Sequence, residues 1–361
     1  MKNIGILLLV AFALVSTSCA PAKKPVSKAD TCPESASDYS IDIYHRDLAF
    51  NGTTAFVETK NEAKPHIIEI DMNGKVIWDY KIPSKIVGGP RHAGLGADIE
   101  WLPEKDHFLF VMPLRGVYEV NRHKEIVWQY ETRKISHDAD RLPNGNTLFV
   151  FGQSDTRSDA QVTEVDPGGN IVWQWFGKDH LKDVGGPHTS EGGFCHTNSV
   201  IRLPNGNTMI SLRNFHMLVE VNRAGEIVWS LRDLKNGKIL KFVHDPEILP
   251  NGNIMLSVHR PQVLIEVTRD GEVVNSFKHP DTILVRNNHR LPNGNTRIVD
   301  CVKIIELSPT NGIVWQCTKR GVDTIGWPDR NNMRRTRGQL LKFFYKAAYL
   351  PGWKAKEDAA N

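Results

Sequence analysis

The chain has 361 residues, with 45 Lys and Arg against 41 Asp and Glu and a formal charge of +4. A hydrophobic share of 40% and a charged share of 24% exclude general disorder. The even charge, without a basic stripe interleaved with aromatics, gives no support for a nucleic-acid partner. With 28 Gly, 20 Pro and 9 Trp, the composition favours an all-β protein of many short strands joined by turns.

The first segment is predicted to direct export. Residues 4–15 form an apolar run of 12 residues, which is too short to span a bilayer but typical of a signal-peptide core. The run leads into Ser16-Thr17-Ser18-Cys19, which resembles the lipobox of bacterial lipoproteins, although Ser16 stands where a large aliphatic residue is usual. We therefore expect residues 1–19 to be a lipoprotein-type signal peptide, Cys19 to be lipidated, and residues 20–40 to be a flexible tether. An ordinary secretory signal with an incidental cysteine is the alternative.

These features predict a protein of the periplasm or cell envelope that is held on the membrane through its lipid. Such a compartment is oxidising, so disulfides are possible. Four cysteines besides the first permit three pairings, and the sequence does not choose among them: Cys32, Cys195, Cys301 and Cys317. None has the C-x-x-C spacing that favours a structural zinc site.

A turn motif recurs along the chain. The sequence Leu-Pro-Asn-Gly-Asn begins at Leu142, Leu203, Leu249 and Leu291, with weaker copies near Leu102 and Leu48. Each copy precedes a β-like run, and Asn-Gly between such runs predicts a hairpin because both turn positions take positive φ. Successive copies are 40 to 61 residues apart, which is near the length of a propeller blade.

A second hairpin follows each first one. It consists of a strand containing Glu, a polar turn and a strand ending in Trp, and its six copies span 67–78, 117–128, 162–173, 218–229, 264–275 and 304–315. Only the fifth copy lacks the Trp and has Asn275. One copy cannot bury its aromatic alone, so the copies must pack face to face. We therefore predict a six-bladed propeller of four-stranded antiparallel blades over residues 41–320, with an open solenoid as the structural alternative.

Two positions in each repeat are predicted to meet at one mouth of the central channel. They lie five residues before and ten residues after the turn leucine, and a hairpin brings such positions to the same end. The pairs are His137 and Gly152, Asn198 and Arg213, His244 and His259, and Arg286 and Cys301. His196 extends the strand of the fourth repeat in the same direction, and His92 and His289 hold looser positions.

Three interpretations of this mouth remain open from spacing alone. His137, His196 and His244 suit a zinc or copper site. Against a metal, the carboxylates Asp138 and Asp245 directly follow His, so strand alternation sends them to the opposite face, where we expect them to bond backbone amides. Arginine and imidazole donors suit an anion such as sulfate, phosphate or carboxylate. The third interpretation is a water-filled channel without a ligand.

The fourth repeat carries a resemblance to a known family. The segments 194–200, 203–207, 211–213 and 226–229 resemble the bacterial arylsulfate sulfotransferases, and His137-Asp138 and His244-Asp245 fit the same pattern in order. The resemblance covers roughly residues 90–320. It implies a six-bladed propeller that moves a sulfuryl group from a phenolic sulfate ester to a phenolic acceptor, with neither a nucleotide donor nor a metal or other cofactor.

The resemblance also implies residue roles. His244 is the expected nucleophile, which forms a sulfohistidine, and His137, His196 and Arg213 are expected to hold the sulfate oxygens. Around the same mouth, Asn198, His259, Arg286 and His289 are the candidate substrate-binding residues. A neutral imidazole is available near neutral pH as a nucleophile, and cationic donors stabilise the charge of the transferring group.

Two features depart from the family pattern. Better-known members carry an N-terminal β-domain, which residues 20–45 are too few to form, and no aryl-binding cluster stands beside the His motifs. The contrasting hypothesis is a propeller lipoprotein without activity, because segments such as 166–173 also resemble the tryptophan-docking motifs of quinoprotein propellers. Residues 321–361 are expected to be an extension with a basic amphipathic helix over 330–346, which either rests on anionic lipid or packs under the propeller.

Overall fold

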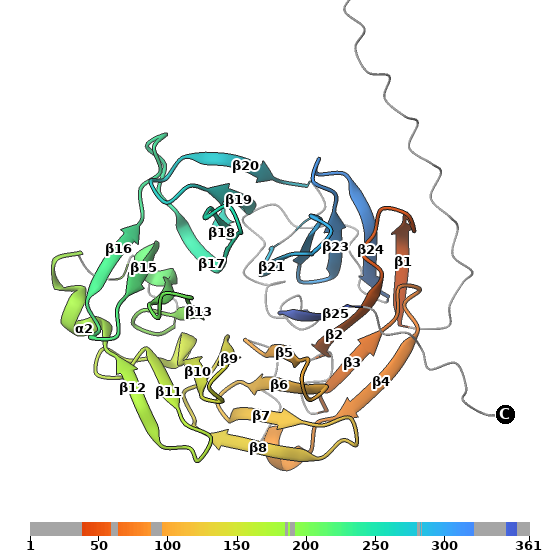
Figure 1. Ribbon diagram of the computed structural model, residues 1–361, viewed down its shortest axis with the longest axis horizontal. Coiled ribbons are helices and arrows are strands. Elements are labelled where there is room, and N and C mark those ends of the chain that lie inside the picture. The colour runs from red at the N-terminus through yellow and green to blue at the C-terminus, as the bar shows by residue number, and fades with distance from the viewer. Residues whose placement is uncertain are drawn as a thin grey trace, which may run out of the picture.

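Six antiparallel sheets are arranged around a common axis (Figure 1). The computed structural model describes residues 38–58, 64–87, 96–184, 187, 192–279, 282, 284–320 and 344–351. Five of the sheets have four strands and the sixth has five. This confirms the predicted all-β, six-bladed propeller.

The first three blades each have four strands that follow one another outward from the channel. From the channel outward, blade one contains β25 (Ala347–Pro351), β2 (Gly52–Glu58), β3 (His66–Ile70) and β4 (Val76–Lys81). Blade two contains β5 (Asp98–Leu102), β6 (His107–Met112), β7 (Gly116–Val120) and β8 (Ile126–Glu131). Blade three contains β9 (Ala139–Arg141), β10 (Thr147–Val150), β11 (Val162–Val165) and β12 (Ile171–Trp175).

The second half of the ring repeats this plan. Blade four contains β13 (Thr197–Arg202), β14 (Thr208–Leu212), β15 (Met217–Val221) and β16 (Ile227–Leu231). Blade five contains β17 (Lys241–Ile248), β18 (Ile254–Arg260), β19 (Val263–Val267) and β20 (Val273–Phe277). Blade six contains β21 (Asn287–Arg290), β22 (Thr296–Val299), β23 (Lys303–Leu307), β24 (Ile313–Lys319) and β1 (Tyr39–Tyr44). The short helices are α1 (Ser84–Val87), η1 (Gly152–Ser154), α2 (Gly177–His180), η2 (Lys182–Val184) and η3 (Arg213–Phe215).

The Leu-Pro-Asn-Gly turns join the two innermost strands of blades three to six. In blade three, Gly145 N donates to Leu142 O at 2.8 Å, and only Gly145 has positive φ, at 87°. The expectation that Asn-Gly supplies two positive φ values was therefore wrong. Pro143 fixes a negative φ at the first turn position, so Pro143 and Asn144 form the turn and the glycine follows it in the left-handed region.

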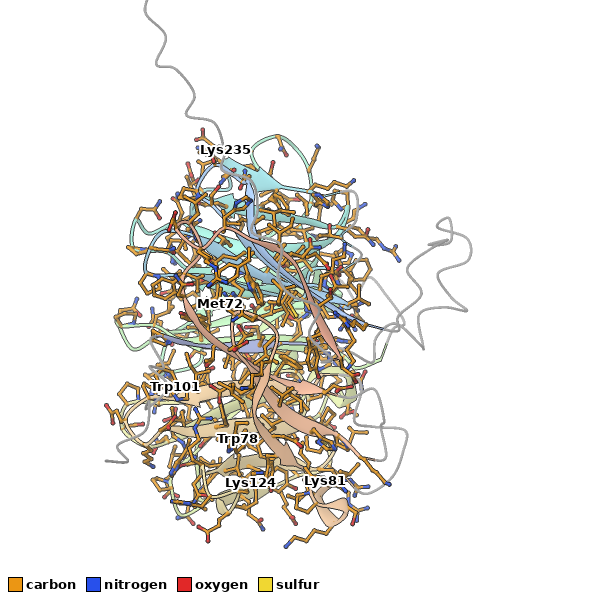
Figure 2. All side chains as sticks on the ribbon, turned by 90° about the vertical axis from the view of Figure 1, so that its right-hand side faces the viewer. Met72, Trp78, Lys81, Trp101, Lys124 and Lys235 are labelled. Atoms are coloured by element: carbon orange, nitrogen blue, oxygen red, sulfur yellow. The ribbon has the colours of Figure 1, made fainter. Side chains whose placement is uncertain are left out.

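The tryptophans that end the fourth strands fasten each blade to the next. Each indole Nε1 donates to a backbone carbonyl of the following blade: Trp78 to Arg122 at 3.2 Å, Trp128 to Pro167 at 2.9 Å, Trp173 to Arg223 at 3.0 Å, Trp229 to Arg269 at 3.0 Å and Trp315 to Met72 at 2.9 Å. Blade five has Asn275 at this position, and its Oδ1 accepts from Asn311 Nδ2 at 3.2 Å. The repeats therefore pack face to face, as predicted. Figure 2 views the ring edge-on and labels Trp78 and Met72.

The two ends of the described chain close the ring (Figure 1). The sequence near Leu48 was expected to turn between two strands of one blade, but β1 pairs with β24 of blade six. Blade one takes its innermost strand from β25, which pairs with β2. Residues 347–351 therefore belong to the propeller, whereas a boundary at residue 320 placed them in an extension.

Several expectations fall on residues outside the described ranges. They concern the signal peptide with Cys19, the tether up to residue 37, Cys32, His92 and the expected helix over 330–343. The part of that helix that is described, residues 344–346, leads into β25 and is not helical. Within the described ranges, no helix has the length and apolar character needed to cross a membrane.

Three of the cysteines are buried free thiols: Cys195, Cys301 and Cys317. Burial raises the pKa of Cys301 to about 11 and the pKa of Cys195 well above its usual value. No disulfide joins these three residues, because Cys195 precedes β13 in blade four, whereas the other two lie on different sides of blade six.

Candidate active site

Histidines from blades three, four and five converge at one mouth of the channel. The ring centroids of His137 and His196 are 5.0 Å apart, and the rings meet edge to face. His244 on β17 stacks on His259 of the neighbouring β18, with 3.7 Å between centroids. The positions five before and ten after the turn leucine therefore do meet at one end.

His137 is held in a backbone conformation that few non-glycine residues adopt. Its φ is 84°, and its N–H donates to Gly96 O at 2.6 Å. Its Nδ1 lies 2.6 Å from Ser136 Oγ. Gly152, at a φ of 53°, leaves the room for this ring, because a Cβ there would lie 2.4 Å from His137 Nδ1. The glycine predicted opposite His137 is therefore needed for the placement of the imidazole.

His196 is held by a carboxylate that the repeat pattern did not reveal. Asp155 accepts from Cys195 N at 2.8 Å and from His196 N at 3.2 Å, and burial raises its pKa to about 6. His196 also has a positive φ of 50°. Its Nδ1–H donates to Gly192 O at 2.7 Å, so Nε2 is the unprotonated nitrogen when the ring is neutral.

His244 is the most enclosed of the imidazoles. It is 3% exposed, and among the described residues its Nε2 has no hydrogen-bond partner. A register shift between His244 and Glu247, together with a φ of 49° at Asp245, turns β17 at this point. Bulges of this kind re-aim side chains beside active sites.

Asn198 was expected to bind substrate, and the structure places it in the junction between blades four and five. Its Nδ2 donates to Val243 O at 2.9 Å, and its Oδ1 accepts from Ser211 Oγ at 2.7 Å. Because Val243 precedes His244, this amide fixes the strand that carries His244. Both polar groups of Asn198 are thus used within the protein.

Two buried guanidinium groups complete the mouth. Arg213 Cζ lies 4.7 Å from the ring centroid of Phe242, and Arg286 Cζ lies 4.6 Å from that of Tyr345. Tyr345 also packs edge-on against His137, with 5.3 Å between ring centroids. The site therefore gathers cationic donors and aromatic faces in one place, although sequence analysis found no aryl-binding cluster.

The surroundings keep the imidazoles neutral. Burial lowers the pKa of His137 well below its usual value, and the nearby His196, Arg286, Arg213 and Lys346 lower it further. Burial likewise lowers the pKa of His244, with further lowering by His259, Arg213, Arg286 and His137. A neutral imidazole close to guanidinium groups is suited to attack an anion.

A layer of carboxylates around one lysine lies behind the histidines. Asp138 Oδ2 accepts from Val200 N at 2.6 Å and Asp245 Oδ2 accepts from Asn288 N at 2.9 Å, which confirms that these aspartates bond backbone amides. Lys346, 7% exposed, forms ion pairs with both aspartates and with Asp98.

A cavity of about 390 Å³ opens on the other side of this layer. Its wall includes Glu100, Asp140, Glu247 and His289. His289 was expected at the substrate, but its side chain is 58% exposed and pairs with Glu247 at 3.4 Å. Because it lies three residues along the strand from Arg286, roughly 10 Å away, the structure does not bring it to the histidine mouth.

Tyr345 and Lys346 were missed because they belong to the C-terminal strand. Leu350-Pro351-Gly352 repeats most of the turn motif, and Tyr345 lies five residues before Leu350. The counting rule that found His137 and His244 therefore also finds Tyr345, once this short copy is recognised. As to metals, the described residues hold no group of three or more His, Cys, Asp and Glu side chains placed to bind an ion.

Comparison with known proteins gives one family. The model of the arylsulfotransferase family matches residues 43–236, which is more than half of the chain and includes His137, His196 and Arg213. The chain belongs to the arylsulfotransferase family. This membership supports an arylsulfotransferase-like function, with small-molecule aryl sulfates and phenols as its substrates. The match ends before His244, so the placement of His244 in the site rests on the structure.

Solved structures share the fold of this arylsulfotransferase family member. A protein of unknown function from Bacteroides caccae is 13% identical with a TM-score of 0.55, and the alignment covers 84% of this chain and 100% of that one. A catalytically inactive virginiamycin B lyase from Staphylococcus aureus is 12% identical with a TM-score of 0.49, over 79% of this chain and 90% of that one. A search of curated proteins found no match.

Proposed function

We propose that the protein transfers a sulfuryl group between phenols through a covalent intermediate on His244. One observation carries this proposal: the buried Nε2 of His244 has no partner among the described residues and lies in a site with two guanidinium groups. A buried polar atom without a partner is costly, so it is retained where function requires it. A bound sulfuryl group would use this nitrogen.

The chemistry has two steps. In the first, the Nε2 lone pair attacks the sulfur of an aryl sulfate, the N–S bond forms, and the S–O bond to the aryl group breaks. The departing phenolate takes the electron pair of that bond. In the second step, the oxygen of a phenolic acceptor attacks the same sulfur, the N–S bond breaks, and its electron pair returns to His244. The acceptor loses its phenolic proton to water or to a neutral imidazole.

Other residues of the mouth have supporting roles in this proposal. Arg213, His137 and His196 donate to the sulfuryl oxygens, which carry negative charge throughout the transfer. Arg286 adds a second guanidinium, and stacking on His259 fixes the plane of the His244 ring. Tyr345 and Phe242 offer faces against which the aryl group can pack.

Intact-mass measurement after incubation with p-nitrophenyl sulfate alone tests the proposal. The expected result is a mass increase of one sulfuryl group, with release of p-nitrophenol, and both should be absent in His244→Asn. His123 is an exposed histidine in a turn of blade two, so His123→Asn is the matched control and should form the adduct normally.

Two results would contradict the proposal. An adduct that persists in His244→Asn would move the nucleophile to another residue. No adduct and no release with several aryl sulfates would favour the alternative, a binding or assembly scaffold without activity.

We also propose that the protein is an exported lipoprotein anchored to the cell envelope through Cys19. The apolar run at residues 4–15 and the small residues before Cys19 support this. In such a location, the enzyme would meet aryl sulfates without access to cytoplasmic nucleotide donors, in agreement with a ping-pong transfer between phenols.

A further inference from the structure

Lys346 is a buried cation at the centre of the channel, and the two proposed steps do not use it. Its Nζ lies 3.2 Å from Asp245 Oδ1 and 3.5 Å from Asp98 Oδ1, and it contacts Asp138 Oδ1 directly. These three carboxylates come from blades five, two and three, whereas Lys346 comes from the end of the chain, next to β25 of blade one. One ammonium group thus connects four blades.

The second oxygen of each aspartate points to the following blade. Asp98 Oδ2 accepts from Ala139 N at 2.9 Å, just as Asp138 accepts from Val200 N and Asp245 from Asn288 N. Each carboxylate is therefore held between Lys346 and a backbone amide. Removing Lys346 would leave three buried carboxylates facing one another without a counter-charge, and such groups protonate or move apart.

Two of these aspartates directly follow histidines of the site. Asp138 follows His137, whose φ is 84°, and Asp245, whose φ is 49°, follows His244. Backbone conformations in this region are retained only when the surroundings hold them. A movement of either aspartate would therefore turn the peptide that carries the neighbouring imidazole.

We propose that Lys346 is a positioning residue for sulfuryl transfer, which orients His137 and His244 by holding the aspartates that follow them. This inference rests on the proposed function, since it assigns a role to Lys346 in the same reaction. Lys346 contacts the layer behind the imidazoles and acts through it, while the donor is bound by the guanidinium groups in front. Loss of Lys346 should therefore lower kcat and change KM little.

The test compares Lys346→Met with Lys346→Arg by steady-state transfer from p-nitrophenyl sulfate to phenol. We expect kcat to fall at least tenfold in K346M, with the KM for the donor within about threefold of the wild-type value. K346R keeps the positive charge and should recover much of kcat.

Lys319 provides a matched control for stability. It is also a buried lysine in ion pairs, with Asp38 at 3.0 Å and Glu58 at 3.2 Å, but it lies at the closure of blades six and one. Lys319→Met should lower the melting temperature as K346M does and leave kcat within twofold of the wild type. This comparison separates positioning from a general loss of stability.

Three outcomes would overturn the inference. In the first, K346M is less stable but retains kcat, so Lys346 is structural only. In the second, K319M loses as much kcat as K346M. In the third, K346R is no more active than K346M. If K346M does not fold, Lys346→Gln, which keeps a donor toward Asp138, takes its place. The wild-type protein reports on the function itself: no adduct there overturns the proposed function and this inference together, whereas an unchanged kcat in the variants overturns this inference alone.

Discussion

Replacing Gly152 by alanine should displace His137 without touching any charged group. At Gly152 a Cβ would lie 2.4 Å from His137 Nδ1 and 2.2 Å from Ser136 Oγ. Ordinary van der Waals contact begins at 3.4 Å, so the imidazole would have to move by about 1.0 Å. Misplacement of a catalytic group by about 1 Å can lower a rate roughly 100-fold.

Gly206→Ala is the control for backbone strain. Gly206 also has a positive φ, 86°, but no other heavy atom lies within 4 Å of a Cβ there. Alanine in this conformation costs roughly 1–2 kcal/mol at either position. Gly152→Ala should cost a further 1–3 kcal/mol or so, because the new methyl group overpacks the site.

The assay is the rate of p-nitrophenol release and of adduct formation, read beside urea unfolding of both variants. We expect Gly206→Ala to transfer sulfuryl groups at nearly the wild-type rate and Gly152→Ala to be slower by one to two orders of magnitude. Equal rates for the two variants would show that the position of His137 does not matter to the reaction.

Three further predictions concern pH, thiols and the lipid. Because the pKa of His244 is lowered well below 6.5, its neutral form persists in acid, and adduct formation should stay at its plateau as pH falls through 6.5; a half-maximal rate at or above pH 6.5 would refute this. Cys195, Cys301 and Cys317 should be inert to a thiol reagent in the folded protein, while at least three thiols should react after unfolding in denaturant, and fewer than three would contradict free cysteines. Cells fed labelled palmitate should label the wild-type protein but not Cys19→Ser, and equal labelling would exclude Cys19 as the anchor.

The blade repeat could be predicted because it is local in sequence. Each turn, each Glu strand and each Trp strand lies within one repeat, so a 40- to 61-residue interval defines a blade. The same regularity located His137 and His244, since a hairpin brings fixed offsets to the same end of a sheet.

The closure of the ring could not be read in this way. The pairing of β1 with β24 joins segments more than 270 residues apart, and nothing in the local pattern of residues 39–44 distinguishes a fourth strand from a fifth. Lys346 was assigned to a basic helix for the same reason, because its aspartate partners are contributed by distant blades. Asp155 lies in a loop that the other repeats lack, so no offset pointed to it.

The closing strand also sets when the site is complete. A nascent chain that has emerged from the ribosome only through blade six has six partly built sheets, but blade one still lacks the strand nearest the axis. Tyr345 and Lys346 arrive with that strand, after the histidines have been made. A product that stops short of residue 345, whether from interrupted translation or from incomplete passage across a membrane, would carry His244 without the surroundings that orient it.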